Sequence, residues 1–337
     1  MKKPITIKDI AEKLNVSVAT VSRALRNSPE IKKETKQAVL KMAKEMNYHP
    51  NLLASSLSSK KSRILGVVVP TINRFFWSNS IAGIEKVAYE ENYKVMIFQS
   101  GESYLKEVEI VDTLANSRVD GIILALSKET SDYSHLKEVM ERGIPLLQFE
   151  RVCREIETSM IQTDDFAGAS EIISHLIQQG RRRIAYMGGP LTLGVCQERL
   201  AGYRDALNTH NLEIVDGFEL ELEDFSYEIA GEAFKKLWRQ KTKPDALFCF
   251  ADILAIGVLH AAQEMKIKVP EELAIAGFGN DVTGRFISPS ITTMAQPSFE
   301  MGELAAKILL ETISGEQDTR LLVKETIKPT LILRESS

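Results

Sequence analysis

The segment that decides the fold of the first fifty residues is Ser17-Val18-Ala19-Thr20-Val21-Ser22-Arg23-Ala24-Leu25. Its apolar residues recur at helical spacing, and Ser17 is a favourable N-cap. A similar helical pattern begins after Thr6. Only a short break separates its end from Ser17, so the two helices must form a tight pair. A third helical pattern ends near Asn47, ahead of a proline, and its apolar stripe is Val39, Met42, Ala43 and Met46. Three short helices with a tight turn between the first two are typical of a helix-turn-helix domain.

The second helix carries side chains suited to the major groove of DNA. Small residues at its start allow its N-terminus to approach base edges. Val18 and Ala19 offer methyl surfaces for thymine methyl groups, and Arg23 can donate two hydrogen bonds to one guanine. A generic three-helix bundle would show the same apolar pattern, so this pattern alone leaves a purely structural role open. The hydroxyls that can donate to phosphates, near the positive end of the helix dipole, belong to Ser17, Thr20 and Ser22.

Charge is distributed unevenly along the 337 residues. Residues 1–63 contain fourteen Lys and Arg against five Asp and Glu, a net charge of +9. The remainder contains 28 basic and 41 acidic residues, a net charge of −13. Because neutralised phosphates release counterions, the basic segment favours nucleic-acid binding. The acidic remainder favours solubility and opposes non-specific binding.

Residues 51–63 differ in composition from both neighbours. They are rich in serine and basic side chains, with too few apolar residues to build a core. Composition alone predicts a linker. The middle of this segment, Leu53 to Leu57, can still form one or two helical turns against a supporting surface.

From residue 64 onward, short apolar strands alternate with helix-length amphipathic segments. The predicted strands are residues 64–69, 94–98, 121–125, 145–149, 184–187, 246–250 and 273–278. Nearly continuous apolar runs of this kind are typical of parallel sheets covered by helices on both faces. Two groups of such units predict two doubly wound α/β lobes. Ligands of open α/β sheets bind outside the carboxyl ends of the strands, so the cleft between the lobes is the expected ligand site.

The same sequence argues against several other classes of protein. No apolar run approaches the roughly 18 residues that span a bilayer, and no signal peptide is present, so we expect a cytoplasmic protein that binds no membrane. The five histidines show no metal-binding or triad signature, and Gly277-Phe278-Gly279 lacks the rest of a dinucleotide fingerprint. We therefore expect no enzyme, no metal and no cofactor. The cysteines lack metal-ligand spacing and are expected to be buried, reduced thiols: Cys153, Cys196 and Cys249.

Blocks of sequence in the right order and spacing resemble the LacI/GalR family of bacterial transcription regulators. Residues 5–11, 16–25 and 47–57 resemble the headpiece and hinge of that family, and residues 180–190, 199–203 and 290–297 resemble its body. The resemblance covers essentially the whole chain. It implies a multidomain protein with an all-α helix-turn-helix headpiece and an α/β periplasmic-binding-protein-like body of two doubly wound parallel-sheet lobes.

The resemblance also implies how the protein meets double-stranded DNA. Family members are dimers or tetramers on near-palindromic operators, so we expect a homodimer or a higher assembly. Residues 51–62 are expected to form a hinge helix on DNA, with Leu57 wedged into the minor groove. Lys32 stands where the family often has a serine or threonine that caps the third helix, which puts that cap in doubt. The DNA-binding residues that we expect are Thr6, Ser17, Val18, Ala19, Thr20, Ser22, Arg23, Asn27, Thr35, Tyr48, Asn51, Ala54, Ser55 and Leu57.

A small-molecule effector site is implied between the lobes. Arg199 matches the family arginine that reaches into the cleft, where it can bind hydroxyls or a carboxylate of the ligand. Phe75 and Phe76 can stack on the apolar face of a sugar, although core or loop packing would explain them equally well. Glu150 and Asp252 each follow a strand, where clefts form, but solvated strand ends would look the same.

Two departures from the family pattern affect this site. The family usually has two aspartates after the strand that ends at Phe278, whereas this chain has Gly279-Asn280, and we expect Asn280 to bind the effector. The family often has asparagine where this chain has Ala251. Because carboxylates and amides pair with different hydroxyl arrangements, a hexose, a pentose, a sugar acid and a glycoside all remain candidates.

These observations predict three parts of the chain. The headpiece is residues 1–50, the hinge helix or linker is 51–62, and the effector-binding and dimerisation body is 63–337. Within the body we expect an N-terminal lobe at about 63–161 and 293–325 and a C-terminal lobe at about 162–292 and 326–337. The predicted function is a repressor of carbohydrate-utilisation genes whose operator affinity is controlled by a sugar-like effector. A sugar-binding protein without a DNA function is the alternative, and the headpiece argues against it.

Overall fold

The structure is a computed structural model that describes residues 5–25, 27–48, 61–315 and 322–337. The chain divides into two compact units, residues 1–62 and residues 63–337. Each unit is built around its own core, and the two are described in turn.

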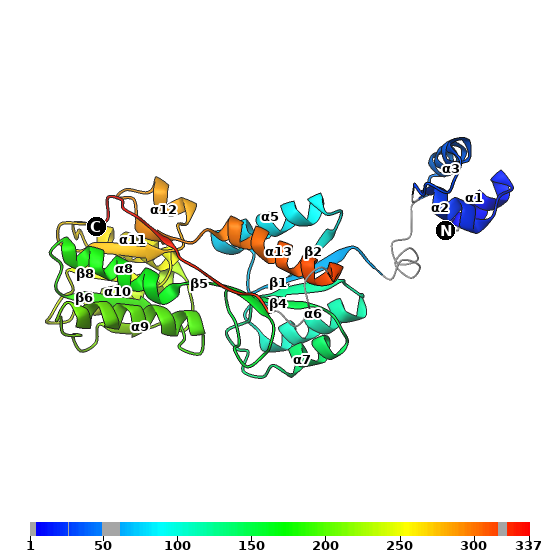
Figure 1. The fold of residues 1–337 in the computed structure, drawn as a ribbon. Helices are drawn as coiled ribbons and strands as arrows, with labels where there is room; N and C mark the ends of the chain where they lie inside the picture. The colour runs from blue at the N-terminus through cyan, green and yellow to red at the C-terminus, as the bar shows by residue number, and fades with distance from the viewer. Residues whose placement is uncertain (1–4, 26, 49–60, 316–321) are drawn as a thin grey trace. The chain divides into compact units, whose positions relative to one another are not determined.

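The first unit is a bundle of three helices, as Figure 1 shows. The helices are α1 (Ile7–Leu14), α2 (Val18–Leu25) and α3 (Lys33–Glu45). At the start of α1, the amide and the hydroxyl of Thr6 each donate to the Asp9 carboxylate at 2.7 Å. Asn15 ends α1 in the left-handed region, at φ 50°, which permits the short turn into α2. The helix-turn-helix prediction is confirmed, with a core of Ile10, Ala11, Val21, Ala24, Val39 and Ala43.

The N-terminal lobe of the second unit is a parallel six-stranded sheet in the order β11-β5-β4-β3-β1-β2. Helices α5 (Phe75–Glu90) and α13 (Ser298–Ser314) cover one face, and α6 (Tyr104–Asn116) and α7 (Ser134–Glu141) cover the other. Successive residues of one strand point to opposite faces, as Val67 and Val68 do. The strands are β1 (Ile64–Val69), β2 (Lys94–Gln99), β3 (Gly121–Leu124), β4 (Leu146–Phe149), β5 (Ser159–Thr163) and β11 (Lys324–Ile327).

The C-terminal lobe repeats this architecture, with the strand order β12-β10-β9-β8-β6-β7 and only β12 antiparallel to its neighbour. Helices α8 (Asp165–Gln178) and α9 (Gly194–Thr209) pack on one face, and α10 (Tyr227–Trp238) and α11 (Asp252–Glu264) pack on the other. A short helix, α12 (Val282–Phe286), follows β9. The strands are β6 (Ile184–Gly188), β7 (Glu219–Glu221), β8 (Ala246–Cys249), β9 (Ala274–Phe278), β10 (Thr292–Ala295) and β12 (Thr330–Ile332).

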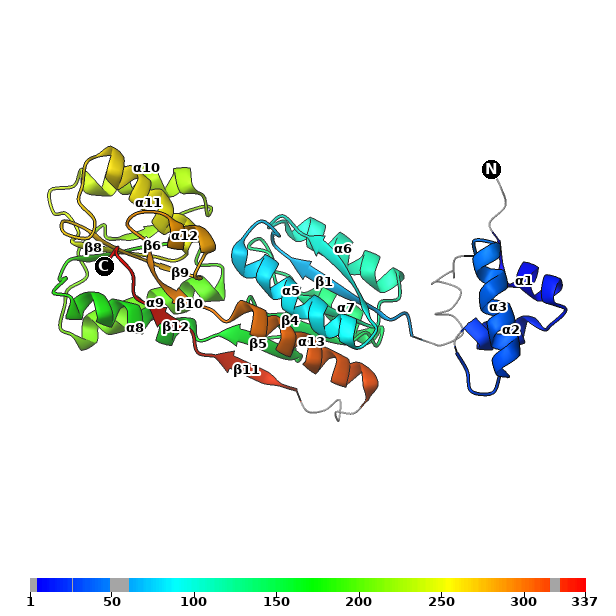
Figure 2. The same ribbon diagram turned by 90° about the horizontal axis from the view of Figure 1, so that it is seen from above.

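The chain crosses between the two lobes three times, after β5, after β10 and after β11 (Figure 2). The prediction of two doubly wound lobes is confirmed, and each strand before a crossing ends two or three residues after the approximate boundary predicted from the sequence. Strands β5 and β11 extend the N-terminal lobe to Thr163 and Ile327, and β10 extends the C-terminal lobe to Ala295. The predicted boundaries lay at about residues 161, 292 and 325. Pro297 and Pro329 lie in two of the crossing segments, two residues after the preceding strands end.

Helices α5 and α13 of the N-terminal lobe pack with their backbones in contact. A Cβ atom at Gly83 would lie 2.1 Å from the carbonyl oxygen of Phe299. A Cβ atom at Gly302 would lie 2.1 Å from the carbonyl oxygen of Ser80. Only glycine fits at these two positions, because any side chain would force the helices apart.

Candidate functional sites in the headpiece and between the lobes

The N-terminus of α2 forms an exposed, capped helix start. The Ser17 hydroxyl accepts the Thr20 amide at 3.0 Å and lies 2.8 Å from the Thr20 hydroxyl. Ser17, Val18 and Ala19 are exposed, whereas Val21 is fully buried in the bundle. The predicted reading residues therefore lie on the outer side of α2. Peptide N–H groups at such a start favour anionic partners such as phosphates.

Further along α2, Arg23 already has a partner within the headpiece. Its guanidinium lies 3.3 Å from the Glu30 carboxylate, and both side chains are largely exposed. An exposed pair of this kind contributes only about 0–1 kcal/mol, so Arg23 can leave Glu30 for a stronger acceptor at little cost.

Asn27 shapes the turn between α2 and α3. It adopts a left-handed conformation, at φ 58°, and its backbone and side-chain oxygens accept the Lys36 ammonium at 3.2 and 2.6 Å. Lys32 begins α3 without a side-chain cap, as its departure from the family pattern indicated. Among the other predicted DNA-binding residues, Thr6 is exposed and Ser22, Thr35 and Tyr48 are half-buried. Outside the described residues lie Asn51, Ala54, Ser55 and Leu57.

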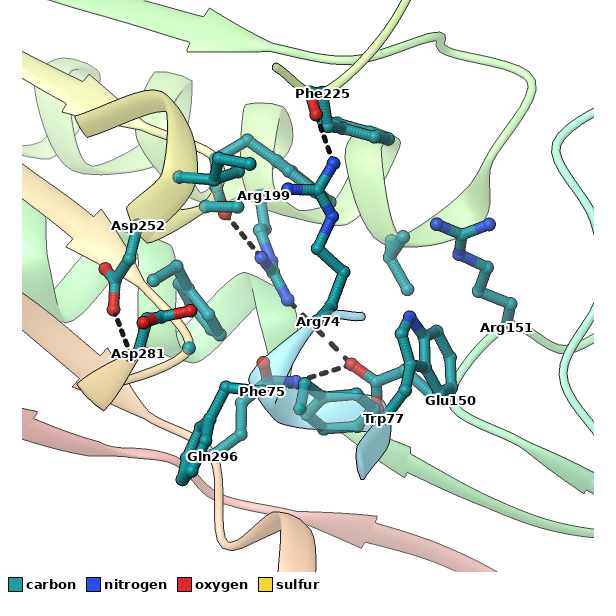
Figure 3. A pocket seen from close by; sticks show the side chains of 17 residues that line it. Arg74, Phe75, Trp77, Glu150, Arg151, Arg199, Phe225, Asp252, Asp281 and Gln296 are labelled. Atoms are coloured by element: carbon teal, nitrogen blue, oxygen red, sulfur yellow. Dashed lines mark hydrogen bonds and ion pairs between the residues drawn. The ribbon is translucent and has the colours of Figure 1, made fainter. Parts of the chain in front are cut away.

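A pocket of about 120 Å³ lies between the two lobes of the body. It lies at the carboxyl ends of the strands, where an open α/β sheet binds its ligand. The N-terminal lobe contributes residues 74–77 at the start of α5 and residues 150–151 after β4. The C-terminal lobe contributes residues from α9, from the loops after β7 and β8, and from the end of β9. Gln296 joins them from the crossing segment between β10 and α13 (Figure 3).

A buried ionic cluster connects the two walls. Arg199 is 4% exposed, and its Nε donates to the Asp165 carboxylate at 2.7 Å while Nη1 donates to the Phe250 carbonyl at 2.6 Å. Its other terminal nitrogen lies 3.8 Å from Glu150 in the opposite lobe. Burial raises the pKa of Asp165 to about 7, although the Arg199 charge opposes that shift. The guanidinium also lies against Phe278, with 3.5 Å between its central carbon and the ring centroid.

Glu150 is held by donors from its own lobe and from a crossing segment. One of its oxygens accepts the Thr163 amide at 3.1 Å and the Thr163 hydroxyl at 2.8 Å. The other oxygen accepts the Gln296 side-chain amide at 2.5 Å. Its backbone is left-handed, at φ 62°, which turns the chain sharply at the end of β4. Non-glycine residues rarely take this conformation, and such strain is often found at functional sites.

Asp252 forms a second buried carboxylate at the start of α11. It accepts the Thr293 hydroxyl at 2.7 Å and the Asp281 amide at 2.6 Å. Burial raises its pKa to about 6, against the effect of these two hydrogen bonds. The carboxylate lies against Gly277, where an added Cβ atom would be 2.1 Å from Oδ1.

Aromatic rings enclose the pocket from both lobes. Phe75, Phe76 and Trp77 line it on the N-terminal side. Phe225 and Phe250 stack on the C-terminal side, with ring centroids 5.0 Å apart and an interplanar angle of 22°. Flat apolar surfaces combined with buried carboxylates suit a ligand with a ring and several hydroxyls.

Several contacts join the lobes at the rim. The Arg74 guanidinium donates to the Phe225 carbonyl, as Figure 3 shows. Lys128 donates to the Glu223 carbonyl at 3.2 Å, and its own carbonyl accepts the Thr192 hydroxyl at 3.4 Å. The lobes are therefore bridged on both the buried and the open side of the pocket.

The structure places five of the six predicted effector residues in the lining: Phe75, Phe76, Glu150, Arg199 and Asp252. The sixth, Asn280, is not in the lining. Its side-chain oxygen accepts Arg334 at 2.6 Å, and its neighbours Gly279 and Asp281 line the pocket instead. The backbone of Asn280 is left-handed, at φ 54°, where its side chain binds Arg334. Residues that the sequence analysis did not select include Arg74, Trp77, Arg151, Phe225, Phe250, Phe278, Asp281 and Gln296.

Among the described residues, no helix is long and apolar enough to cross a membrane. The same residues contain no group of three or more His, Cys, Asp or Glu side chains placed to hold a metal ion. All three cysteines are buried, and none forms a disulfide.

Both the headpiece and the body of the chain match known protein families. Residues 6–51 match bacterial regulatory proteins of the lacI family, and residues 173–337 match a periplasmic binding protein-like domain. The HTH-type transcriptional repressor CytR of Escherichia coli (strain K12) is 34% identical over 312 residues, which cover 92% of this chain and 90% of that protein.

Two solved structures share the fold over nearly the whole chain. A complex of the transcriptional regulator CelR with cellobiose has 26% identity and a TM-score of 0.75, and covers 99% of this chain and 100% of its own. The lac repressor dimer bound to operator and to the anti-inducer ONPF has a TM-score of 0.88 and covers 99% of each chain. At 23% identity, this second likeness concerns the fold alone.

Proposed function

Because this chain belongs to the lacI family of bacterial regulatory proteins, we propose that it is a homodimeric transcriptional repressor controlled by a sugar-like effector. The observation that carries the effector role is the pocket between the lobes, whose walls are joined by the buried pair of Arg199 and Glu150. A ligand that competes for these side chains changes the contacts between the lobes. The relatives named above are transcription regulators, and we propose no catalytic activity for this chain. Its place of action is the cytoplasm, where its DNA target lies.

The DNA-binding role is supported by the headpiece. The exposed residues at the start of α2 suit the major groove, and residues 1–63 carry the excess of basic side chains. A homodimer would place two such helices on the two half-sites of a near-palindromic operator. The lac repressor structure named above contains a dimer on its operator, which is the assembly we propose here.

The proposed control is an allosteric coupling between two sites in one chain. The effector must favour a lobe arrangement different from the one that the operator favours, and the coupling is then reciprocal. The expected carrier of the coupling is residues 51–62, which lie between the headpiece and the body. Carbohydrate-utilisation genes are the proposed targets, because sugars fit the chemistry of the pocket.

The test uses the full-length protein and a pool of randomised DNA duplexes. After selection, we expect an inverted repeat, with binding measured by fluorescence anisotropy at fixed salt. Adding a panel of neutral and acidic sugars should change that affinity for at least one compound. A protein that binds all duplexes equally would contradict the regulator assignment, and an operator affinity that no sugar alters would contradict the effector assignment.

A further inference from the structure

We propose that the effector pocket selects ligands without negative charge, so that neutral sugars bind and sugar phosphates and sugar acids are rejected. This inference rests on the proposed function, because it names the chemical class of ligand for the same pocket. The evidence for this inference is the arrangement of charged side chains that line the pocket or lie directly behind its wall.

The pocket is lined by three arginines, and two of them are already paired with carboxylates. Arg199 is held by Asp165 at 2.7 Å and also lies 3.8 Å from Glu150. Arg151 donates to both oxygens of Glu102, at 2.7 and 3.0 Å. The positive charge of each guanidinium is already balanced by a neighbouring carboxylate, so a ligand anion gains less from either arginine than it would from an unpaired one.

Arg74 is the remaining lining cation, and among the described residues it has no carboxylate partner. Its guanidinium donates to the Phe225 carbonyl across the rim of the pocket. A ligand anion that bound Arg74 would have to share or break this bridge between the lobes. Anion binding would therefore weaken the closure that encloses the ligand.

Carboxylates outnumber the arginines at this site. Glu150, Asp252 and Asp281 line the pocket, and Asp165 and Glu102 lie directly behind its arginines. Five acidic groups thus face three guanidiniums. Arg334 lies behind Asp252 and brings the count to five carboxylates against four guanidiniums, so the site offers a ligand anion no surplus of positive charge. Carboxylates are instead good acceptors for the hydroxyls of a neutral sugar.

The experiment compares matched compounds by thermal shift, followed by calorimetry with the full-length protein. The probes are D-glucose with D-glucose 6-phosphate and D-gluconate, D-galactose with D-galacturonate, and D-ribose with D-ribose 5-phosphate. At least one neutral sugar should raise the melting temperature, and its anionic counterpart should bind at least tenfold more weakly. An anionic compound that binds better than its neutral counterpart would overturn the charge inference alone. No binding by any compound would overturn the proposed sugar effector and this inference with it.

A charge-removing variant tests the cause. Asp281→Asn removes one carboxylate from the lining and retains a residue type that caps α12 well. The anionic compound should gain about tenfold in affinity relative to its neutral counterpart. Asp216→Asn, at an exposed carboxylate outside the lining, is the matched control and should leave the ratio unchanged. Equal ratios in both variants and the unmodified protein would contradict the proposal.

Discussion

Replacing Arg199 with methionine should destabilise the body, and the loss should grow as the pH rises. The substitution removes the hydrogen bond to the Phe250 carbonyl and the charge shared by Asp165 and Glu150. Hydrogen bonds that involve a charged group contribute about 1.5–3 kcal/mol. We expect the variant to lose this much free energy of unfolding near pH 6, where Asp165 is mostly protonated in both proteins.

Above pH 7 the free energies of unfolding of the unmodified protein and the variant diverge. In the unmodified protein Asp165 loses its proton near pH 7, since burial raises its pKa to about 7. The variant lacks the Arg199 charge and hydrogen bond, both of which lower this pKa, so its native state keeps the proton to higher pH. The unfolded chain holds no proton there. The free energy of unfolding of the variant therefore falls by about 1.4 kcal/mol per pH unit relative to the unmodified protein.

Between pH 7 and pH 9 the variant loses up to about 2.7 kcal/mol more of its free energy of unfolding. Together with the loss at pH 6, the total is roughly 5 kcal/mol. Urea unfolding at pH 6, 7.5 and 9, followed by tryptophan fluorescence, measures this directly. The only two tryptophans of the chain, Trp77 and Trp238, lie in α5 and α10 of the body, one in each lobe. The signal therefore reports the body and not the headpiece.

The control is the double variant Arg199→Met with Asp165→Asn, which has no titrating group at position 165. Its loss of stability should not deepen between pH 7 and pH 9. A single variant whose loss is constant from pH 6 to pH 9 would refute the reasoning. A double variant that falls as steeply as the single variant would also refute it, because the titrating group would then lie elsewhere.

Three other expectations concern different links between structure and function. Arg23→Ala should cost roughly 1–3 kcal/mol of operator affinity and relax base preference at one position of each half-site, measured by anisotropy on single-base operator variants; an equal loss on all sequences would make it a phosphate contact. Leu57→Ala should reduce operator bending and affinity, and an unchanged bend angle would remove the wedge role. Gly83→Ala should destabilise the body by about 1–3 kcal/mol in urea, because its Cβ atom would lie 2.1 Å from a carbonyl oxygen. Gly194→Ala, with no atom within 4 Å, should be neutral or stabilising, and similar losses in both variants would contradict the packing argument.

The headpiece and the predicted strands could be recognised from local sequence because each is determined by nearby residues. Capping by Ser17 and the apolar periodicity of α2 are local signals, and both are present in the structure. The seven predicted strands correspond to the buried strands β1, β3, β4, β6, β8 and β9 and to the edge strand β2. Strands β5, β7, β10, β11 and β12 were not predicted, because most of them are short or polar and lie at edges or crossings.

The pocket was only partly predictable for a different reason. Glu150 and Asp252 follow strands, so the general rule for open sheets selects them, and the same rule applied to Phe250 and Phe278 would have found two more lining residues. Asp165 could not be selected, because its role depends on Arg199 reaching it from 34 residues away. Asn280 was selected by position, but its side chain turns to Arg334 in the structure.

Gln296 places a limit on how this pocket can change over evolution. It lies on a segment that connects the lobes, and its amide binds Glu150 at 2.5 Å and the Thr163 hydroxyl at 2.7 Å. A substitution of Gln296 therefore changes the pocket wall and the connection between the lobes at the same time. Descendants of this chain that change residue 296 are expected to carry compensating changes at positions 150 or 163.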